Sequence, residues 1–131
     1  MYIQRPICAF LLVCAVVAVQ ADVHEADTNG DGKTDQWIER VDGTLTTVET
    51  DRDYDGAVDH TVEYDEDGMK SVEEMDYNFD GTMDDYSYFE SGVLATREID
   101  TNDDGRVDLW VYLSEGMYIR KYERDTDYDG T

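Results

Sequence analysis

Short runs of aromatic and branched residues alternate with polar turns along most of the chain. The first members of each pair of runs are Trp37-Ile38, Thr61–Tyr64, Tyr86–Phe89 and Trp110–Leu113. The second members, each reached through a glycine-bearing turn, are Thr44–Thr50, Met69–Met75, Val93–Ile99 and Met117–Arg124. Two β-prone runs around such a turn are typical of a hairpin, and no segment shows helical spacing over three turns. The pattern predicts an all-β fold of four hairpins in an elongated or meander-like sheet, and leaves open which face is buried.

An aspartate-rich motif, D-x-[D/N]-x-D-G-x-x-D, separates the hairpins. It occupies residues 27–35, 51–59, 76–84 and 100–108, and a fifth copy begins at Asp125 and stops at Thr131. Successive copies start 24 or 25 residues apart, which is the signature of a tandem repeat. We therefore expect an array of hairpin units over residues 22–131. The incomplete last copy leaves open whether the array continues.

The motif has the chemistry of a calcium loop. Ca²⁺ takes six to eight oxygen ligands, which alternate side chains and one backbone carbonyl of a tight turn can supply, and the glycine at position 6 allows the turn. The predicted side-chain ligands, at positions 1, 3, 5 and 9, are Asp27, Asn29, Asp31, Asp35, Asp51, Asp53, Asp55, Asp59, Asp76, Asn78, Asp80, Asp84, Asp100, Asn102, Asp104, Asp108 and, in the incomplete copy, Asp125, Asp127 and Asp129. The predicted carbonyl ligands belong to Lys33, Ala57, Thr82 and Arg106. Four complete loops predict about four bound ions, or five with the last copy.

These nine residues resemble the first part of an EF-hand loop, and the loops of dockerins and of thrombospondin type 3 repeats. The resemblance implies calcium at the loops and does not extend to the helical EF-hand fold. The bidentate glutamate expected at position 12 is replaced by Ile38, Val62, Ser87 and Val111. The cysteines of thrombospondin repeats are also missing from the array.

A glutamate stands two residues before every loop. These residues are Glu25, Glu49, Glu74, Glu98 and Glu123. Residues two apart on a strand point to the same side, so each glutamate is expected beside the first aspartate of its loop. They are candidates for the carboxylate that position 12 lacks. The alternative is a solvated strand face.

The first 21 residues read as a secretory signal peptide. Arg5 precedes an apolar run, Ile7–Val19, and Val19-Gln20-Ala21 offers a small-residue cleavage site. An uncleaved anchor is the alternative, although the run is short for a membrane span. Cleavage predicts a secreted or extracellular chain, or a periplasmic or cell-surface one, with no membrane span. It would also remove both cysteines, so no disulfide would stabilise the mature chain.

Charge limits the function further. The chain carries −23 at neutral pH, and loss of Arg5 with the signal would leave −24. Such a chain repels nucleic acid and opposes its own compaction, so bound cations are expected to support the fold. Every repeat is alike, whereas a catalytic site is a single place, so we expect no enzyme. The sequence favours a calcium-stiffened structural, spacer or matrix protein; the alternative is a module that binds an extracellular glycan or protein through aromatic strand faces.

Overall fold

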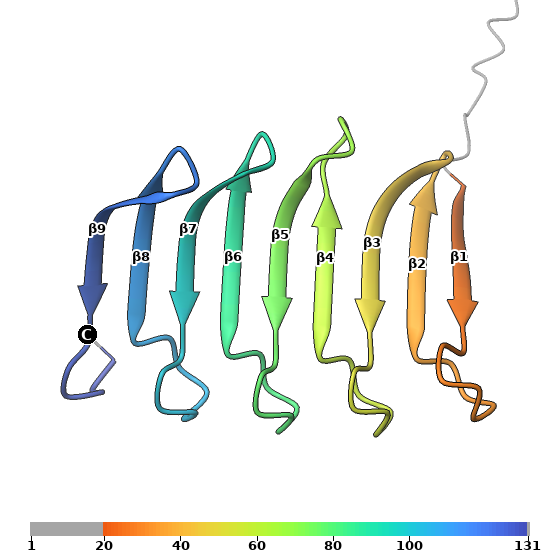
Figure 1. Ribbon diagram of the computed structural model, residues 1–131, viewed down its shortest axis with the longest axis horizontal. Helices are drawn as coiled ribbons and strands as arrows, with labels where there is room; N and C mark the ends of the chain where they lie inside the picture. Colours follow the sequence, from red (N-terminus) through yellow and green to blue (C-terminus); the bar gives the residue numbers. More distant parts are fainter. Residues whose placement is uncertain (1–19, 131) are drawn as a thin grey trace, which may run out of the picture.

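The computed structural model describes residues 20–130 as one antiparallel β-sheet (Figure 1). Its strands are β1 (Ala21–Ala26), β2 (Gln36–Val41), β3 (Thr44–Thr50), β4 (His60–Tyr64), β5 (Lys70–Met75), β6 (Asp85–Glu90), β7 (Val93–Ile99), β8 (Leu109–Ser114) and β9 (Tyr118–Arg124). Each strand pairs with the next one along the chain, so the sheet is a meander. The prediction of an all-β fold of tandem hairpins is confirmed. The strand β1 lies before the first loop and was not among the predicted hairpin strands.

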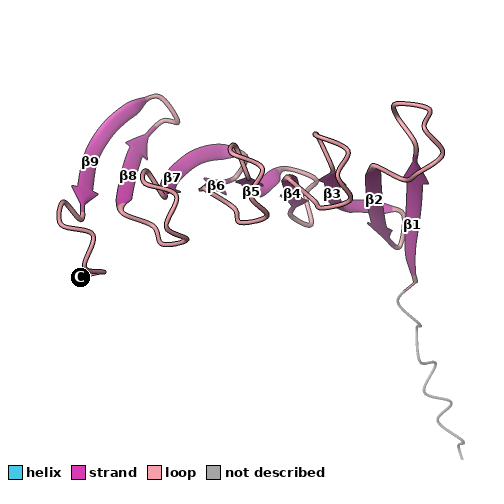
Figure 2. Cartoon of the chain, turned by 90° about the horizontal axis from the view of Figure 1, so that it is seen from below, coloured by secondary structure: helices cyan, strands magenta, loops and turns pink. Residues whose placement is uncertain are grey.

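Two kinds of connection alternate along the sheet. Short turns join the strands of each hairpin at one end of the strands, and the aspartate-rich loops lie together at the opposite end (Figure 1). We call this line of loops the loop edge of the sheet. The strands form a single layer that twists along its length (Figure 2). Two strand spacings separate successive loops, so the loops follow one another at intervals of about 10 Å.

The hairpin turns have a geometry that suits twisted strands. In Asp42-Gly43, Ser91-Gly92 and Glu115-Gly116 both residues have positive φ, which defines a type I′ connection. Each hairpin also contains one register shift close to its turn, as between Glu39 and Arg40 of the first hairpin. Such bulges increase the local twist.

The strand register assigns side chains to two faces, because residues directly opposite each other across neighbouring strands share a face. We call one face of the sheet the glutamate face. Its row of residues nearest the loops consists of Glu25, Trp37, Glu49, Thr61, Glu74, Tyr86, Glu98, Trp110 and Glu123. We call the other face the network face. One of its rows consists of His24, Ile38, Val48, Val62, Glu73, Ser87, Arg97, Val111 and Tyr122.

Neither face is covered by a second layer within residues 20–130 (Figure 2). Val62, at 6% exposure, is the single buried apolar residue of this part of the chain. The centre of the network face is instead polar: Arg97 forms a two-point ion pair with Asp85, with Nε to Oδ1 at 2.9 Å. Hydrophobic burial is therefore a minor source of stability in this sheet.

The predicted signal peptide falls outside the described residues, except for Gln20 and Ala21. These two residues lie at the start of β1, where the carbonyl of Gln20 accepts the N–H of Asp42 at 3.0 Å. No helix within the described range is long and apolar enough to cross a membrane.

Candidate metal centres in the loops

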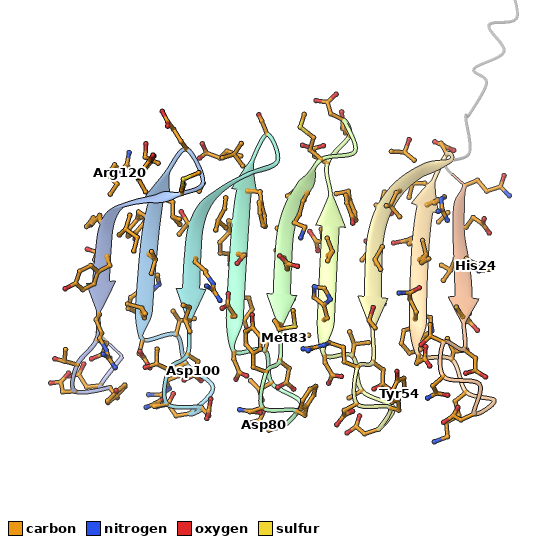
Figure 3. All side chains as sticks on the ribbon, viewed as in Figure 1. His24, Tyr54, Asp80, Met83, Asp100 and Arg120 are labelled. Carbon is orange, nitrogen blue, oxygen red and sulfur yellow. The ribbon has the colours of Figure 1, made fainter. Side chains whose placement is uncertain are left out.

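Each aspartate-rich motif forms a loop at the same end of the sheet. Residues 27–35, 51–59, 76–84 and 100–108 connect β1 to β2, β3 to β4, β5 to β6 and β7 to β8, and residues 125–130 follow β9. Side chains crowd these loops along one edge, where Tyr54, Asp80 and Asp100 are labelled (Figure 3). The sheet therefore places all predicted ligand loops in one line.

The first and last aspartates of the loops are among the most buried side chains of residues 20–130. Exposure is 7% or less for Asp35, Asp51, Asp59, Asp76, Asp84, Asp100, Asp108 and Asp125. Asp27, at the start of the first loop, is exposed. Isolated carboxylates are costly to bury, so these need hydrogen-bond donors or cations nearby.

Backbone N–H groups supply part of that need, as the second loop shows. Asp51 accepts the N–H of Tyr54 at 2.7 Å and that of Gly56 at 2.8 Å. Asp59 accepts the N–H of Arg52 at 2.6 Å and that of the next residue at 3.2 Å. The third loop repeats this arrangement. The end aspartates thus hold each loop closed around a small acidic space.

The middle aspartates and asparagines form Asx turns inside each loop. Asp53 accepts the N–H of Asp55 at 3.1 Å, and Asp55 accepts that of Ala57 at 2.7 Å. The other three complete loops contain the same two contacts. Position 7, whose carbonyl is a predicted ligand, is held by this second contact. The carbonyl's role stays a prediction.

Two loops bring three carboxylates together. Single oxygens of Asp51, Asp53 and Asp59 lie within 4.8 Å of one another, and so do those of Asp125, Asp127 and Asp129. Either group can hold a metal ion, since carboxylate oxygens are the preferred ligands of hard cations. Asp55 is not part of its loop's group. In the other complete loops position 3 is asparagine, so an amide oxygen stands where these groups have a third carboxylate.

The electrostatics of the loops show both stabilisation and repulsion. The N–H of Gly32 lowers the pKa of Asp27, and the N–H of Gly130 lowers that of Asp125. Although burial opposes the shift, backbone N–H groups led by that of Gly105 also lower the pKa of Asp100. Asp53 behaves differently: reduced hydration and the carboxylates of its own loop raise its pKa. The second loop therefore holds excess negative charge that a cation would neutralise.

A backbone ladder links successive loops. The N–H of Asp51 donates to the carbonyl of Asp35 at 2.9 Å, and that of Asp76 to the carbonyl of Asp59 at 2.8 Å. The same bond joins Asp100 to Asp84 and Asp125 to Asp108. The first residue of each loop is thus fixed to the last residue of the loop before it.

The five glutamates lie beside the loops and in neither of the three-carboxylate groups. They are the members of the row on the glutamate face that come from β1, β3, β5, β7 and β9. Glu25 accepts the hydroxyl of Thr34 at 3.4 Å, and Glu123 binds Lys121 and Tyr112. Their part in calcium binding stays a prediction.

Comparisons with known proteins give no match to this chain: no family, no curated protein and no solved structure is detectably similar. The assignment of the loops as candidate metal centres therefore depends on their own geometry.

Two features of the site were not predicted from the sequence. Position 4 of every loop has positive φ, although only Gly30 is glycine; the others are Tyr54, Phe79, Asp103 and Tyr128. The ladder between loops is the second feature, because backbone contacts between repeats leave no trace in side-chain identity. The regular period of 24 or 25 residues was the one available sign that equivalent loop atoms would align.

Proposed function

We propose that this chain is a secreted calcium-binding repeat protein with a structural, spacer or matrix role, folded and stiffened by its ions. The observation that carries the proposal is the second loop, where Asp51, Asp53 and Asp59 converge within 4.8 Å. Two of these three carboxylates are 3% exposed or less. Buried, converging and charged oxygens are what a hard divalent cation requires.

The donor set supports calcium over softer metals. The loops offer carboxylate, amide and carbonyl oxygens, and neither histidine nor cysteine occurs within them. Zinc sites in proteins are built mainly from those two residues. Magnesium is expected to compete poorly, because it demands a smaller and stricter octahedron than a flexible loop provides.

The ladder between loops supports a stiffening role. Because each loop is bonded through its first residue to the loop before it, an ion that orders one loop also fixes an end of the next. A line of such sites at intervals of about 10 Å would brace one edge of the thin sheet.

Calorimetric titration of the full mature chain with calcium tests the proposal. We expect about four ions to bind with dissociation constants of roughly 10⁻⁵ to 10⁻³ M, the second loop most tightly. Magnesium at equal concentration should give little heat. Absence of binding at several millimolar calcium would rule the proposal out.

A further inference from the structure

The glutamate face carries a regular alternation of acidic and ring-bearing residues. The five glutamates of the row nearest the loops lie on alternate strands, and the residues between them are Trp37, Thr61, Tyr86 and Trp110. Successive glutamates are two strands apart, so their spacing is about 9.6 Å. Three of the four intervals therefore contain an aromatic ring.

Most of this charge has no partner cation within residues 20–130. Of the ion pairs there, one lies on the glutamate face, between Lys121 and Glu123. The position equivalent to Lys121 in the other repeats is occupied by Val23, Thr47, Val72 and Thr96. The residue opposite this position is Tyr88 in the Glu98 unit but a second carboxylate, Glu39 or Glu63, in the Glu49 and Glu74 units, so all three units have the acid without the ammonium.

The Lys121 unit shows how one glutamate of the row is paired. Its Nζ lies 2.7 Å from a carboxylate oxygen of Glu123 and 5.1 Å from the ring centroid of Tyr112. The hydroxyl of Tyr112 donates to the other oxygen of Glu123 at 3.0 Å. A carboxylate and a ring therefore hold one ammonium together, through a charged hydrogen bond and a cation–π contact.

The Glu98 unit has the acid and the ring for the same contact, since Tyr88 lies opposite Thr96 as Tyr112 lies opposite Lys121, and the Glu49 and Glu74 units have a pair of carboxylates instead. Burial and the carboxylates of Glu98 and Glu74 raise the pKa of Tyr88. A hollow of about 400 Å³, lined in part by Trp37, Glu49 and Thr61, opens at the other end of the face. Apart from Lys121, no cation of residues 20–130 forms an ion pair with the row.

We propose that the glutamate face binds an extended peptide segment that carries a lysine at every third residue in the polyproline II conformation and runs across the strands. That conformation has three residues per turn and rises about 3.1 Å per residue, so equivalent lysines are about 9.3 Å apart. The mismatch with the glutamate row is about 0.3 Å per step, which lysine side chains can absorb. A β-strand fits worse, because its same-side residues are about 6.6 or 13 Å apart.

This inference goes beyond calcium binding, and its test keeps the two apart. The probe is a synthetic peptide of four Pro-Pro-Lys triplets, added to the full mature chain in saturating calcium. Because Trp37 and Trp110 lie in the row, tryptophan fluorescence should change saturably with peptide. A peptide of the same composition with its lysines in one block should bind weaker by about tenfold or more, since it cannot engage all units at once.

Substitutions on the glutamate face test whether the peptide binds there. Glu49→Gln combined with Glu98→Gln should weaken the periodic peptide by about tenfold. Glu66→Gln combined with Glu115→Gln removes the same charge at the hairpin turns and should change little. Thr96→Lys places an ammonium beside Glu98, opposite Tyr88 and Tyr112, and should weaken the peptide by occupying that unit.

The other possible outcomes each overturn or support peptide binding by the glutamate face. Equal binding of the two peptides would show attraction by net charge alone and overturn the inference. Lower calcium stoichiometry in the Glu49/Glu98 variant would make the glutamates calcium ligands, which overturns the inference and leaves the calcium proposal standing. Binding of a β-linked oligosaccharide or self-association in place of the peptide would also overturn it. If the double variant loses its circular dichroism signal, Thr96→Lys decides alone.

Discussion

Each loop places two residues in the left-handed region, at positions 4 and 6, and this backbone turns its N–H groups onto the first aspartate. Glycine at position 6 signals the conformation in the sequence. Position 4 does not, because Tyr54 and Phe79 adopt φ of 67° and 60° there. Such a conformation costs a non-glycine residue roughly 1–2 kcal/mol. The hydrogen bonds from these residues to Asp51 and Asp76, both at 2.7 Å, offset that cost.

Replacing the glycine at position 6 should therefore destabilise a loop through its backbone alone. Gly81 has φ of +88°, and a Cβ there would meet nothing within 4 Å. Gly81→Ala is expected to lower the free energy of unfolding by about 1 kcal/mol, measured by urea denaturation in saturating calcium. Thr82→Ala, at the next position, is the control and should stay within about 0.5 kcal/mol of wild type. Equal effects from both would show that the conformation at Gly81 carries no cost.

Asp53→Asn should have opposite effects with and without calcium. The amide keeps the acceptor for the N–H of Asp55 and removes a carboxylate whose pKa is raised by reduced hydration and by its neighbours. In chelator the variant should retain more residual strand signal than wild type, because one repelling carboxylate is gone. In a calcium titration its second loop should bind about tenfold more weakly, because ligand charge sets affinity. Asp67→Asn, in a hairpin turn at the other edge, is the control and should change neither measurement.

At the scale of the strands, ion pairs on the network face take the place of apolar packing. Glu73 of β5 lies 3.0 Å from Nζ of Lys70 and 2.9 Å from Nε2 of His60 on β4. Burial opposes ionisation of Glu73, but these two partners lower its pKa below the ordinary value of 4.5. The pair with His60 joins two neighbouring strands, so its loss should weaken the sheet.

The stability difference between wild type and Glu73→Gln should depend on pH. A carboxyl group whose pKa is lowered by folding stabilises the folded state above its unfolded value and loses that contribution as pH falls through the folded value. The variant should therefore be less stable above pH 4.5, with a difference that shrinks in more acidic solution. Thermal denaturation from pH 7 to pH 3 measures this. A difference independent of pH would assign the effect to packing, and Glu66→Gln at an exposed turn should leave the curve unchanged.

The strands show where sequence reasoning succeeds. The runs Thr44–Thr50 and Val93–Ile99 match β3 and β7 residue for residue, because turn glycines and loop aspartates mark both ends. The strand β1 has little apolar content, and its extended structure depends on pairing with β2. The faces were not assigned because each mixes rings with charges: Trp37 opposes Glu49 on one, and Val62 opposes Glu73 on the other. Their roles depend on register, which the composition of a single strand does not reveal.

At the scale of the whole molecule, the sheet is a one-dimensional array. Each hairpin contacts only its neighbours through strand pairing, and each loop is bonded to the loop before it. In such arrays stability is close to a sum of repeat and nearest-neighbour terms. Calcium bound at one loop should therefore favour order in the adjacent loops, and binding along the edge should be cooperative.

The last prediction is that this array folds only with its metal. Val62 is the one buried apolar residue between Gln20 and Gly130, whereas the first and last aspartates of the loops, except Asp27, are buried, and two loops hold three like charges in a close group. Two unit charges 4 Å apart repel by about 1 kcal/mol in water and by more near a protein surface, and the loops contain several such pairs. A thin sheet without a hydrophobic core offers little to oppose that repulsion. The proposed calcium ions would bind the folded loops and hardly the unfolded chain, so their binding energy would become folding energy.

In chelator we therefore expect an expanded chain with little strand signal, which compacts into an elongated particle as calcium is added. Circular dichroism and small-angle scattering, each recorded with chelator and with calcium, measure the two changes. High monovalent salt should restore part of the compaction by screening, but not the ordered loops, since screening supplies no ligands. If the chelated chain keeps its strand content, radius and cooperative melting, strand pairing and the network-face ion pairs are sufficient for folding, and calcium binds to a sheet that is already formed.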